Sequence, residues 1–360
     1  MTEYCGLSHV IEADAHDAAC RHDRAIDSLA RGTKAGDIES MTRLAKRLLI
    51  GDRAPYLPRE GAGFLVDAAN AGGAEAPAIL AVLSGAGVQM NQSWPNALSS
   101  LVLSAERGWQ PAREQLCVLA VDRQLAAEGA KQGAPPDLWK RLAVSVTAGP
   151  WGTAPAEVVV HEDPAVRSFP GLLTGEICDW LIAQARPRLA RAKVYDAVAG
   201  QTITHRTRTN TAATFTLVEV GFVHLIVQAR MSAACGLPIT NMEAATILHY
   251  DPGEEITNHF DFVDPATPNY AEELQRNGQR VVTFLAYLND DYEAGETAFP
   301  QLGVSHKGRR GDGLFFVNAH PNGDPDTRMV HAGRPPARSD KWIVSQFIRS
   351  RGFITDAARS

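Results

Sequence analysis

The sequence predicts an α+β protein in which an all-α domain of helical repeats precedes a β-rich domain of the sandwich or jelly-roll type. Two observations lead to this fold class. In the Ala- and Leu-rich first third, Gly36, Gly72 and Gly108 recur at a spacing of 36 residues. Beyond Pro155, short runs of β-branched residues alternate with turn residues. At 360 residues, the chain is long enough for two separate cores.

The N-terminal repeat carries apolar residues in phase with its glycines. A leucine stands seven residues before each glycine and another stands eight residues after it, namely Leu29, Leu65, Leu101 and Leu44, Leu80, Leu116. This pattern is typical of stacked helix-turn-helix units, each of which buries its face against a neighbour. It resembles Sel1-like repeats, relatives of the tetratricopeptide repeat, over about residues 22–122. We therefore predict a repeat domain at residues 1–125, for which the resemblance implies a protein-binding surface. A plain helical domain whose glycines align by accident is the alternative.

Residues 126–155 lose the repeat and are rich in Gly and Pro, so we predict a linker there and a second domain at residues 156–360. The β-branched runs of this domain include "AATFTLVEV", "AATILHYDP", "RVVTFLAYLND" and "KWIVSQFIRS". Short strands separated by turn residues are typical of a sandwich or jelly-roll barrel. Helical patterns at residues 174–189 and 222–236 are expected to buttress the sheet.

The composition argues against several classes of protein. The formal charge of −6 is spread over the chain without a long basic run, so no nucleic acid partner is expected. The five cysteines are scattered and lack a C-x-x-C spacing, which argues against a disulfide framework or a zinc knuckle. No apolar window reaches the roughly 18 residues of a membrane span, and the N-terminal segment lacks the pattern of a signal peptide. We expect a cytoplasmic protein with no membrane partner.

The segment "EITNHFDF" holds the first candidate for chemistry, the pair His259 and Asp261. Alternate residues of a strand point to the same face, so both side chains would project together. A third ligand must come from elsewhere, and His331 in "RMVHAGRPP" follows Asp261 by 70 residues. Two histidines and a carboxylate, with three positions left open, suit non-haem Fe(II), although zinc or another divalent ion accepts the same ligands. A second triplet of this kind at residues 161–163 has no such downstream partner, and we assign it a structural role.

Lys341 follows His331 by ten residues and begins the last apolar run. A lysine at the mouth of a barrel core is unfavourable unless an anion pairs with it. A dicarboxylate cosubstrate supplies that anion when one end chelates the metal and the other end reaches the lysine. Because a hydrolytic zinc site has no need of such an anchor, Lys341 favours the iron interpretation.

These segments together resemble the prolyl 4-hydroxylase branch of the Fe(II)/2-oxoglutarate-dependent dioxygenases. The likeness runs from about residue 165 to 350 in five collinear pieces: "FPGLLTGEICDWLIAQARPRL", "HRTRTN", "EAATILHYDPGEEITNHFDF", "RVVTFLAYLNDDYEAGETAFP", and the segment from "KGRRGDG" to "SQFIR". It implies a double-stranded β-helix (jelly-roll) catalytic domain with buttressing helices. It also implies the use of Fe(II), 2-oxoglutarate and O2, with ascorbate as a reductant.

The resemblance implies roles for single residues. Three would bind iron: His259, Asp261 and His331. Three would bind 2-oxoglutarate: Lys341 at the C5 carboxylate, Tyr250, and Thr283 through its hydroxyl. Two in "HRTRTN" would bind substrate or lie in solvent: Arg206 and Arg208. Glu296, in a segment matching the family's Gly-Gly-Glu-Thr turn, is expected to be structural.

We therefore expect a dioxygenase that hydroxylates a prolyl residue in a peptide or protein and converts 2-oxoglutarate to succinate and CO2. The helical repeats would recruit the target. One alternative keeps the same iron chemistry but acts on free proline, another amino-acid side chain or a small metabolite. A repeat-based scaffold with an inactive barrel is a further alternative, and the joint presence of the iron and cosubstrate residues argues against it.

Overall fold

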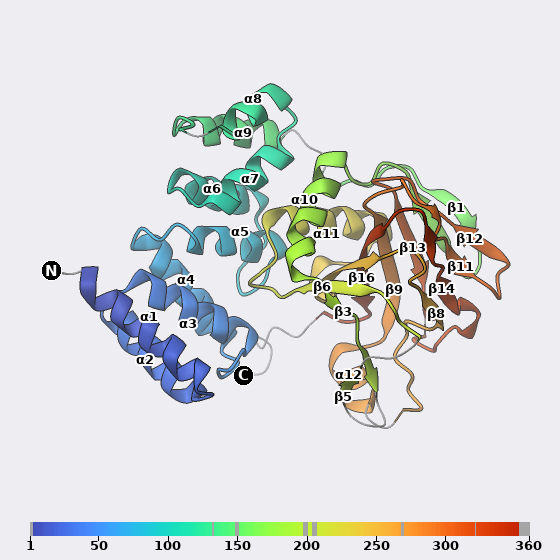
Figure 1. Cartoon of the computed structure of the whole chain (residues 1–360), viewed down its shortest axis with the longest axis horizontal. Coiled ribbons are helices and arrows are strands. Elements are labelled where there is room, and N and C mark those ends of the chain that lie inside the picture. The colour runs from blue at the N-terminus through green and yellow to red at the C-terminus, as the bar shows by residue number, and fades with distance from the viewer. Residues whose placement is uncertain are drawn as a thin grey trace. The chain divides into compact units, whose positions relative to one another are not determined.

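The computed structural model describes residues 3–131, 133–147, 151–196, 201–203, 207–267, 270–320 and 322–352 (Figure 1). The chain divides into two compact units. One comprises residues 1–149 with 216–225, and the other comprises residues 150–215 with 226–360. The first is mainly helical and the second is built on β-sheets, so the predicted α+β class is confirmed. No helix in the described part of the chain combines the length and apolarity that crossing a membrane requires.

Antiparallel helix pairs form the first unit, as the repeat predicts. Its helices are α1 (Glu3–Ala18), α2 (His22–Lys34), α3 (Ile38–Ile50), α4 (Pro58–Asn70), α5 (Ala76–Ala86), α6 (Trp94–Glu106), α7 (Gln110–Leu119), α8 (Arg123–Gly129) and α9 (Leu138–Thr147). Most of the repeated leucines lie inside: Leu29, Leu65, Leu101 and Leu116 are fully buried, Leu44 is nearly so, and Leu80 is half-buried. Consecutive helices pack on one another, so each repeat covers the apolar face of the next.

The repeated glycines connect the two helices of each pair. Gly36, Gly72 and Gly108 have φ angles of +82°, +101° and +92°, a region that side chains disfavour. A Cβ at Gly36 or Gly72 would meet no atom within 4 Å. Glycine is therefore needed at these turns for backbone conformation and not for space.

Much of the stretch predicted as a linker is helical. Helix α9 lies within residues 126–155, and α8 ends there. Leu138, Trp139, Leu142 and Val146 recur at helical spacing and are buried, and α9 packs on α6, α7 and α8. The 36-residue repeat ends before this stretch, but apolar residues continue to recur at the 3.6-residue period of an α-helix.

The second unit contains two larger sheets among its described residues. The first has the order β1-β2-β13-β9-β16-β7-β6-β3 and the second the order β12-β11-β14-β8. The strands of the first are β1 (Val158–His161), β2 (Val166–Phe169), β3 (Ala190–Arg191), β6 (Thr211–Phe215), β7 (Ala245–Tyr250), β9 (Arg280–Tyr287), β13 (Gly313–Val317) and β16 (Lys341–Arg349). Those of the second are β8 (Ile256–His259), β11 (Thr297–Phe299), β12 (Val304–His306) and β14 (His331–Gly333). Two short pairs are β4 (Val194–Asp196) with β5 (Gln201–Ile203), and β10 (Glu293–Ala294) with β15 (Pro336–Ala337).

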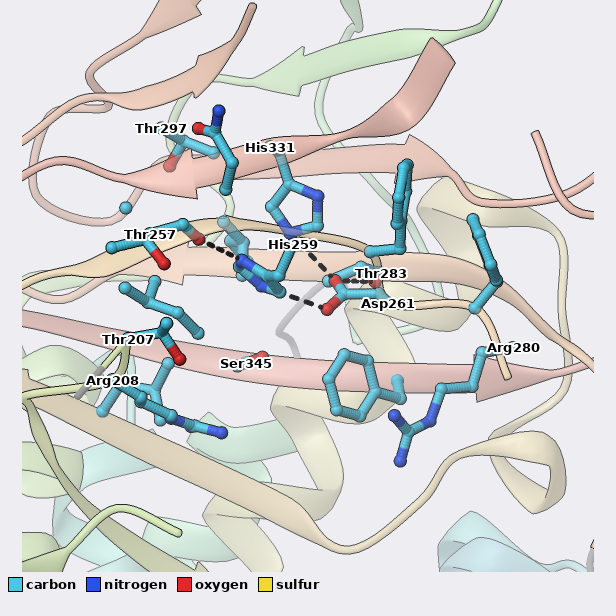
Figure 2. Close-up of a pocket in the computed structure, with 18 of the residues that line it drawn as sticks. Thr207, Arg208, Thr257, His259, Asp261, Arg280, Thr283, Thr297, His331 and Ser345 are labelled. Atoms are coloured by element: carbon cyan, nitrogen blue, oxygen red, sulfur yellow. Dashed lines mark hydrogen bonds and ion pairs between the residues drawn. The ribbon is translucent and has the colours of Figure 1, made fainter. Parts of the chain in front are cut away.

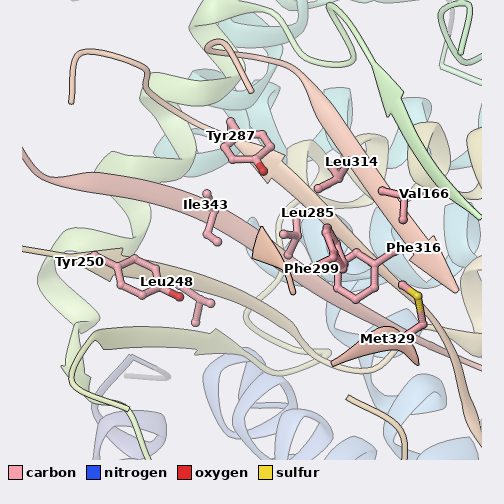
Figure 3. Packing of buried hydrophobic residues seen from close by; sticks show 10 residues of the cluster. All are labelled: Val166, Leu248, Tyr250, Leu285, Tyr287, Phe299, Leu314, Phe316, Met329 and Ile343. Atoms are coloured by element: carbon pink, nitrogen blue, oxygen red, sulfur yellow. The ribbon is translucent and has the colours of Figure 1, made fainter. Parts of the chain in front are cut away.

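Apolar side chains join the two larger sheets (Figure 3). Phe299 of the smaller sheet packs in one cluster with Leu248, Leu285, Phe316 and Ile343 of the larger sheet. Two antiparallel sheets closed over such a core form the predicted double-stranded β-helix. The predicted helices are present as α10 (Gly175–Ala185) and α11 (Phe222–Cys235), and a short α12 (Ala271–Asn277) precedes β9.

Candidate active site

Strand pairing brings the predicted iron ligands together. Strands β8 and β14 are antiparallel, and His331 lies directly opposite His259. Asp261, two residues beyond His259, turns its carboxylate between the two rings (Figure 2). Its Oδ1 is 3.4 Å from His259 Nε2, and its Oδ2 is 3.2 Å from His331 Nε2. One ligand atom from each residue lies within 4.8 Å of the others, a spacing that one metal ion can bridge.

The Nδ1 atoms of both histidines, which point away from the carboxylate, are hydrogen-bonded to backbone carbonyls. His259 Nδ1 lies 2.8 Å from the carbonyl oxygen of Thr257, and His331 Nδ1 lies 3.0 Å from that of Met329. A carbonyl only accepts, so each Nδ1 carries the proton and donates it. Each Nε2 is then left to face the centre, which is the arrangement that metal-binding histidines use.

The centre is electrostatically prepared for a cation. Burial alone would raise the pKa of Asp261, but the facing His331 and His259 hold that pKa well below its ordinary value. Burial likewise opposes a charge on His331, yet the Asp261 carboxylate raises the His331 pKa. A divalent ion bound by the two Nε2 atoms would compensate the carboxylate in their place.

Thr283 differs from its predicted role. Its hydroxyl donates to Asp261 Oδ2 at 2.7 Å and accepts from Asn318 Nδ2 at 2.8 Å. Both Thr283 and Asn318 are almost fully buried. The structure therefore engages this hydroxyl with the Asp261 carboxylate, whereas the resemblance implied a bond to the C5 carboxylate of 2-oxoglutarate beside Lys341.

Lys341 is fully buried at the start of β16, directly opposite Tyr250 of β7. Its Nζ donates to the carbonyl of Gly295 at 2.7 Å and lies 5.2 Å from the centre of the Tyr250 ring. Burial lowers the pKa of Lys341 to about 7; Glu296 acts against this and Lys307 adds to it. An ammonium has three donors, so this one can still accept an anionic partner.

Thr297 is a cavity residue that the sequence reasoning missed. It is buried on β11 opposite Gly333 of β14, and its Oγ1 is 3.0 Å from the hydroxyl of Tyr287. Gly295, two residues earlier, is the residue whose carbonyl Lys341 contacts. The segment "GETAFP" could have indicated this residue, because Thr297 directly follows Glu296 in the turn that matches the family motif.

One cavity of about 450 Å³ unites most of the predicted residues. Its lining includes the triad, Lys341, Tyr250, Thr283, Thr297 and Arg208. The side chain of His259 is 28% exposed, so the cavity opens to solvent beside the triad. Arg206 lies outside the described residues.

The second His-x-Asp triplet, residues 161–163, makes its hydrogen bonds and ion pairs away from the cavity. His161 Nδ1 lies 2.9 Å from the carbonyl oxygen of Pro164, Glu162 pairs with Arg167, and Asp163 pairs with Arg328. None of the three lines the cavity described above. This agrees with the structural role assigned to the triplet.

Comparison with known proteins places this site in a family. The model of the 2OG-Fe(II) oxygenase superfamily matches residues 245–349, which include the triad and Lys341. Prolyl 4-hydroxylase 1 of Arabidopsis thaliana is 31% identical over 208 residues, which cover 54% of this chain and 71% of that protein. The chain belongs to the prolyl 4-hydroxylase family. This family member is therefore a 2-oxoglutarate-dependent dioxygenase whose cofactors are Fe(II), 2-oxoglutarate and O2.

The chain is also similar to a longer prolyl 4-hydroxylase subunit and to several solved structures. The prolyl 4-hydroxylase subunit alpha-1 of Gallus gallus is 29% identical over 191 residues, covering 53% of this chain and 37% of that one. Among solved structures, a viral collagen prolyl hydroxylase from Paramecium Bursaria Chlorella virus-1 is 25% identical with a TM-score of 0.41, covering 52% and 96% of the two chains. A Sel1 repeat protein from Oxalobacter formigenes is 28% identical with a TM-score of 0.28, covering 33% and 97%.

Proposed function

We propose that this chain hydroxylates a prolyl residue of a peptide or protein, converting 2-oxoglutarate and O2 to succinate and CO2. The observation that carries the proposal is the presence of a 2-His-1-carboxylate triad and a fully buried lysine in one cavity. A metal centre alone would not require a buried cation, whereas a chelating dicarboxylate requires both.

In this proposal His259, Asp261 and His331 hold Fe(II). Their geometry fits because both Nδ1 atoms are bound to carbonyls and both Nε2 atoms face the carboxylate. Bound there, Fe(II) with 2-oxoglutarate supplies the oxidative decarboxylation that inserts one oxygen atom into a C–H bond. The role of Thr283 is to orient Asp261, since its hydroxyl donates to the same carboxylate.

The far carboxylate of 2-oxoglutarate would be bound by Lys341 and Thr297. A carboxylate paired with the ammonium would relieve the cost of burying this cation. Tyr250 would flank the cosubstrate, because it is paired with Lys341 across the sheet and lines the same cavity. Ascorbate remains a prediction from the family resemblance.

The substrate proline would enter beside His259, where the cavity meets solvent. Phe260 is 41% exposed there and stacks on Phe262 with ring centroids 4.7 Å apart. Both rings line the cavity. A pyrrolidine ring packs well on such an aromatic face, so the pair favours a prolyl residue over a small charged metabolite.

We further propose that the repeat domain recruits the protein target to a catalytic domain that begins near residue 156. Stacked helical repeats expose an extended surface suited to proteins. A cytoplasmic location is proposed as well, because Cys20, Cys117, Cys178 and Cys235 are all free thiols.

The test is to incubate the purified chain with Fe(II), 2-oxoglutarate and proline-containing peptides, and to measure succinate together with hydroxyproline by mass spectrometry. We expect both products in equal amounts and the loss of both in His259→Ala. His161→Ala, which changes the same residue type outside the cavity, is the matched control and should keep both activities. Succinate without hydroxyproline would favour another substrate, and the absence of both products would favour the scaffold alternative.

A further inference from the structure

We propose that Arg208 and Lys193 bind a carboxylate of the substrate, so that the hydroxylated proline stands close to an aspartate or glutamate in its peptide. The inference rests on the proposed prolyl hydroxylation and adds the chemistry of the residues that flank the target. It follows from the balance of charge around the cavity and from how these two side chains are held.

The charges at one end of the cavity are already compensated. Arg280 donates to both carboxylate oxygens of Glu243, at 2.6 and 2.8 Å. Glu243 also accepts from Arg349, and Arg349 pairs with Glu273 at the cavity wall. Two arginines and two glutamates form this network, so it presents no net charge to a ligand.

The charges at the centre balance once the cofactors are bound. Lys341 and Asp261 carry opposite charges, and a divalent metal cancels a doubly charged dicarboxylate. Among the described side chains that line the cavity, this leaves Arg208 and Lys193 as cations without an acidic partner. The chain as a whole carries −6, so this positive rim is not a general property of its surface.

Arg208 is fixed next to the strand that carries His259. The Thr257 amide donates to the Thr207 carbonyl and the Thr209 amide donates to the Glu255 carbonyl, both at 2.9 Å. These bonds lock the segment around Arg208 against β8. Figure 2 shows Arg208 and Arg280 on opposite sides of the triad in the view, Arg208 to the lower left and Arg280 to the lower right.

The guanidinium of Arg208 is also oriented. Its Nε donates to Asn210 Oδ1 at 3.2 Å, and Asn210 is fully buried. Within the described part of the chain, no acidic side chain pairs with its terminal nitrogens. A guanidinium held at Nε presents two parallel donors, which is the geometry that binds a carboxylate at both oxygens.

Lys193 is brought to the same rim by the neighbouring strand. The Ala192 amide donates to the Asn210 carbonyl at 3.0 Å, which continues the pairing of β3 with β6 up to the residue before Lys193. Lys193 is exposed and lines the cavity. Two cations at the mouth of a low-dielectric cavity attract an anion more strongly than a neutral peptide carbonyl.

The first measurement uses a pool of proteome-derived peptides incubated with the enzyme, Fe(II) and 2-oxoglutarate. Peptides that gain about 16 Da on proline, the mass of the single oxygen this chemistry inserts, are sequenced. We expect Asp and Glu to be enriched within a few residues of the modified proline. Hydroxyproline without such enrichment would overturn this inference alone, whereas no hydroxyproline at all would overturn the proposed function.

The second measurement assigns the effect to Arg208. The best acidic peptide and its Glu→Gln partner are compared for kcat/KM, and for binding by fluorescence anisotropy to enzyme loaded with Mn(II) and 2-oxoglutarate. We expect the acidic peptide to be preferred by about tenfold or more, as for a charge-assisted hydrogen bond. Arg208→Gln and Lys193→Gln should reduce that preference, and Arg208→Lys should keep part of it.

The control is Arg276→Gln, which removes the same charge from an exposed position on α12 outside the cavity lining and should keep the preference. If Arg208→Gln weakened both peptides equally, Arg208 would bind the peptide backbone and the inference would be wrong. It would also be wrong if Arg208→Gln raised KM for 2-oxoglutarate and left the peptide preference intact.

Discussion

Replacing Lys341 by methionine should stabilise the protein that lacks metal and cosubstrate while removing its ability to bind 2-oxoglutarate. Methionine keeps most of the volume of the side chain and removes the charge. Lys341 is fully buried, and its single described hydrogen bond goes to the neutral carbonyl of Gly295. The folded protein therefore carries an ammonium whose anionic partner arrives only with the ligand.

The magnitude follows from the lowered pKa. Burial takes the pKa of Lys341 from the ordinary 10.5 to about 7. At about 1.36 kcal/mol for each tenfold change in proton affinity, this costs the folded state about 4–5 kcal/mol when the amine is charged. Losing the bond to Gly295 and leaving that carbonyl unpaired gives back about 2 kcal/mol. The net gain expected for Lys341→Met below pH 7 is about 2–3 kcal/mol.

The pH dependence has a definite sign. Between about pH 7 and 10.5 the unfolded chain keeps the lysine proton while the folded protein releases it. Stability of the native protein therefore rises with pH across this window by about 1.36 kcal/mol per pH unit. The advantage of Lys341→Met shrinks accordingly, disappears near about pH 9 and reverses at higher pH, where only the lost bond to Gly295 counts. Below pH 7 both states hold the proton, so the advantage is full and constant.

Differential scanning calorimetry tests this directly. For a unit of this size, the gain corresponds to a rise in Tm of about 5–10 °C at pH 6. Lys34→Met, which removes the same charge from an exposed lysine of α2, is the control and should show no such rise. In the presence of Mn(II), which the intact triad of both proteins can bind, adding 2-oxoglutarate should further stabilise only the native protein. A Lys341→Met protein that is less stable than the native one at every pH would refute the reasoning.

Three further predictions concern the same cavity. Thr283→Val should weaken metal binding about 10–100-fold by releasing Asp261, measured by Co(II) titration, and Thr283→Ser should restore it. KM for 2-oxoglutarate should be constant below about pH 7 and rise about tenfold per pH unit above it, as Lys341 loses its proton; a Lys341→Arg enzyme that showed the same rise would contradict this. Phe260→Ala should raise KM for the peptide several-fold while peptide-independent succinate formation stays unchanged, and Phe260→Tyr should behave as the native enzyme.

The ligands could be predicted from the sequence because their chemistry is local. A strand places His259 and Asp261 on one side, and His331 becomes a candidate because Lys341 follows it by ten residues. What the sequence does not contain is the register of β8 against β14, which sets His331 opposite His259. The helix within the predicted linker was also missed. Loss of a 36-residue period does not imply loss of the 3.6-residue period that forms α9.

The two threonines show most clearly where sequence reasoning ends. The resemblance implied that Thr283 reaches the same carboxylate as Lys341 from a neighbouring strand. In the structure β9 does pair with β16, but the residue opposite Thr283 is Phe347, six positions along the strand from the lysine. At about 3.3 Å per residue this is close to 20 Å, too far for one carboxylate to span. Thr297 instead lies two residues from the carbonyl that Lys341 contacts. Register, which depends on pairing between distant segments, therefore places the Thr283 hydroxyl at the Asp261 carboxylate and makes Thr297 the hydroxyl that we propose for the cosubstrate.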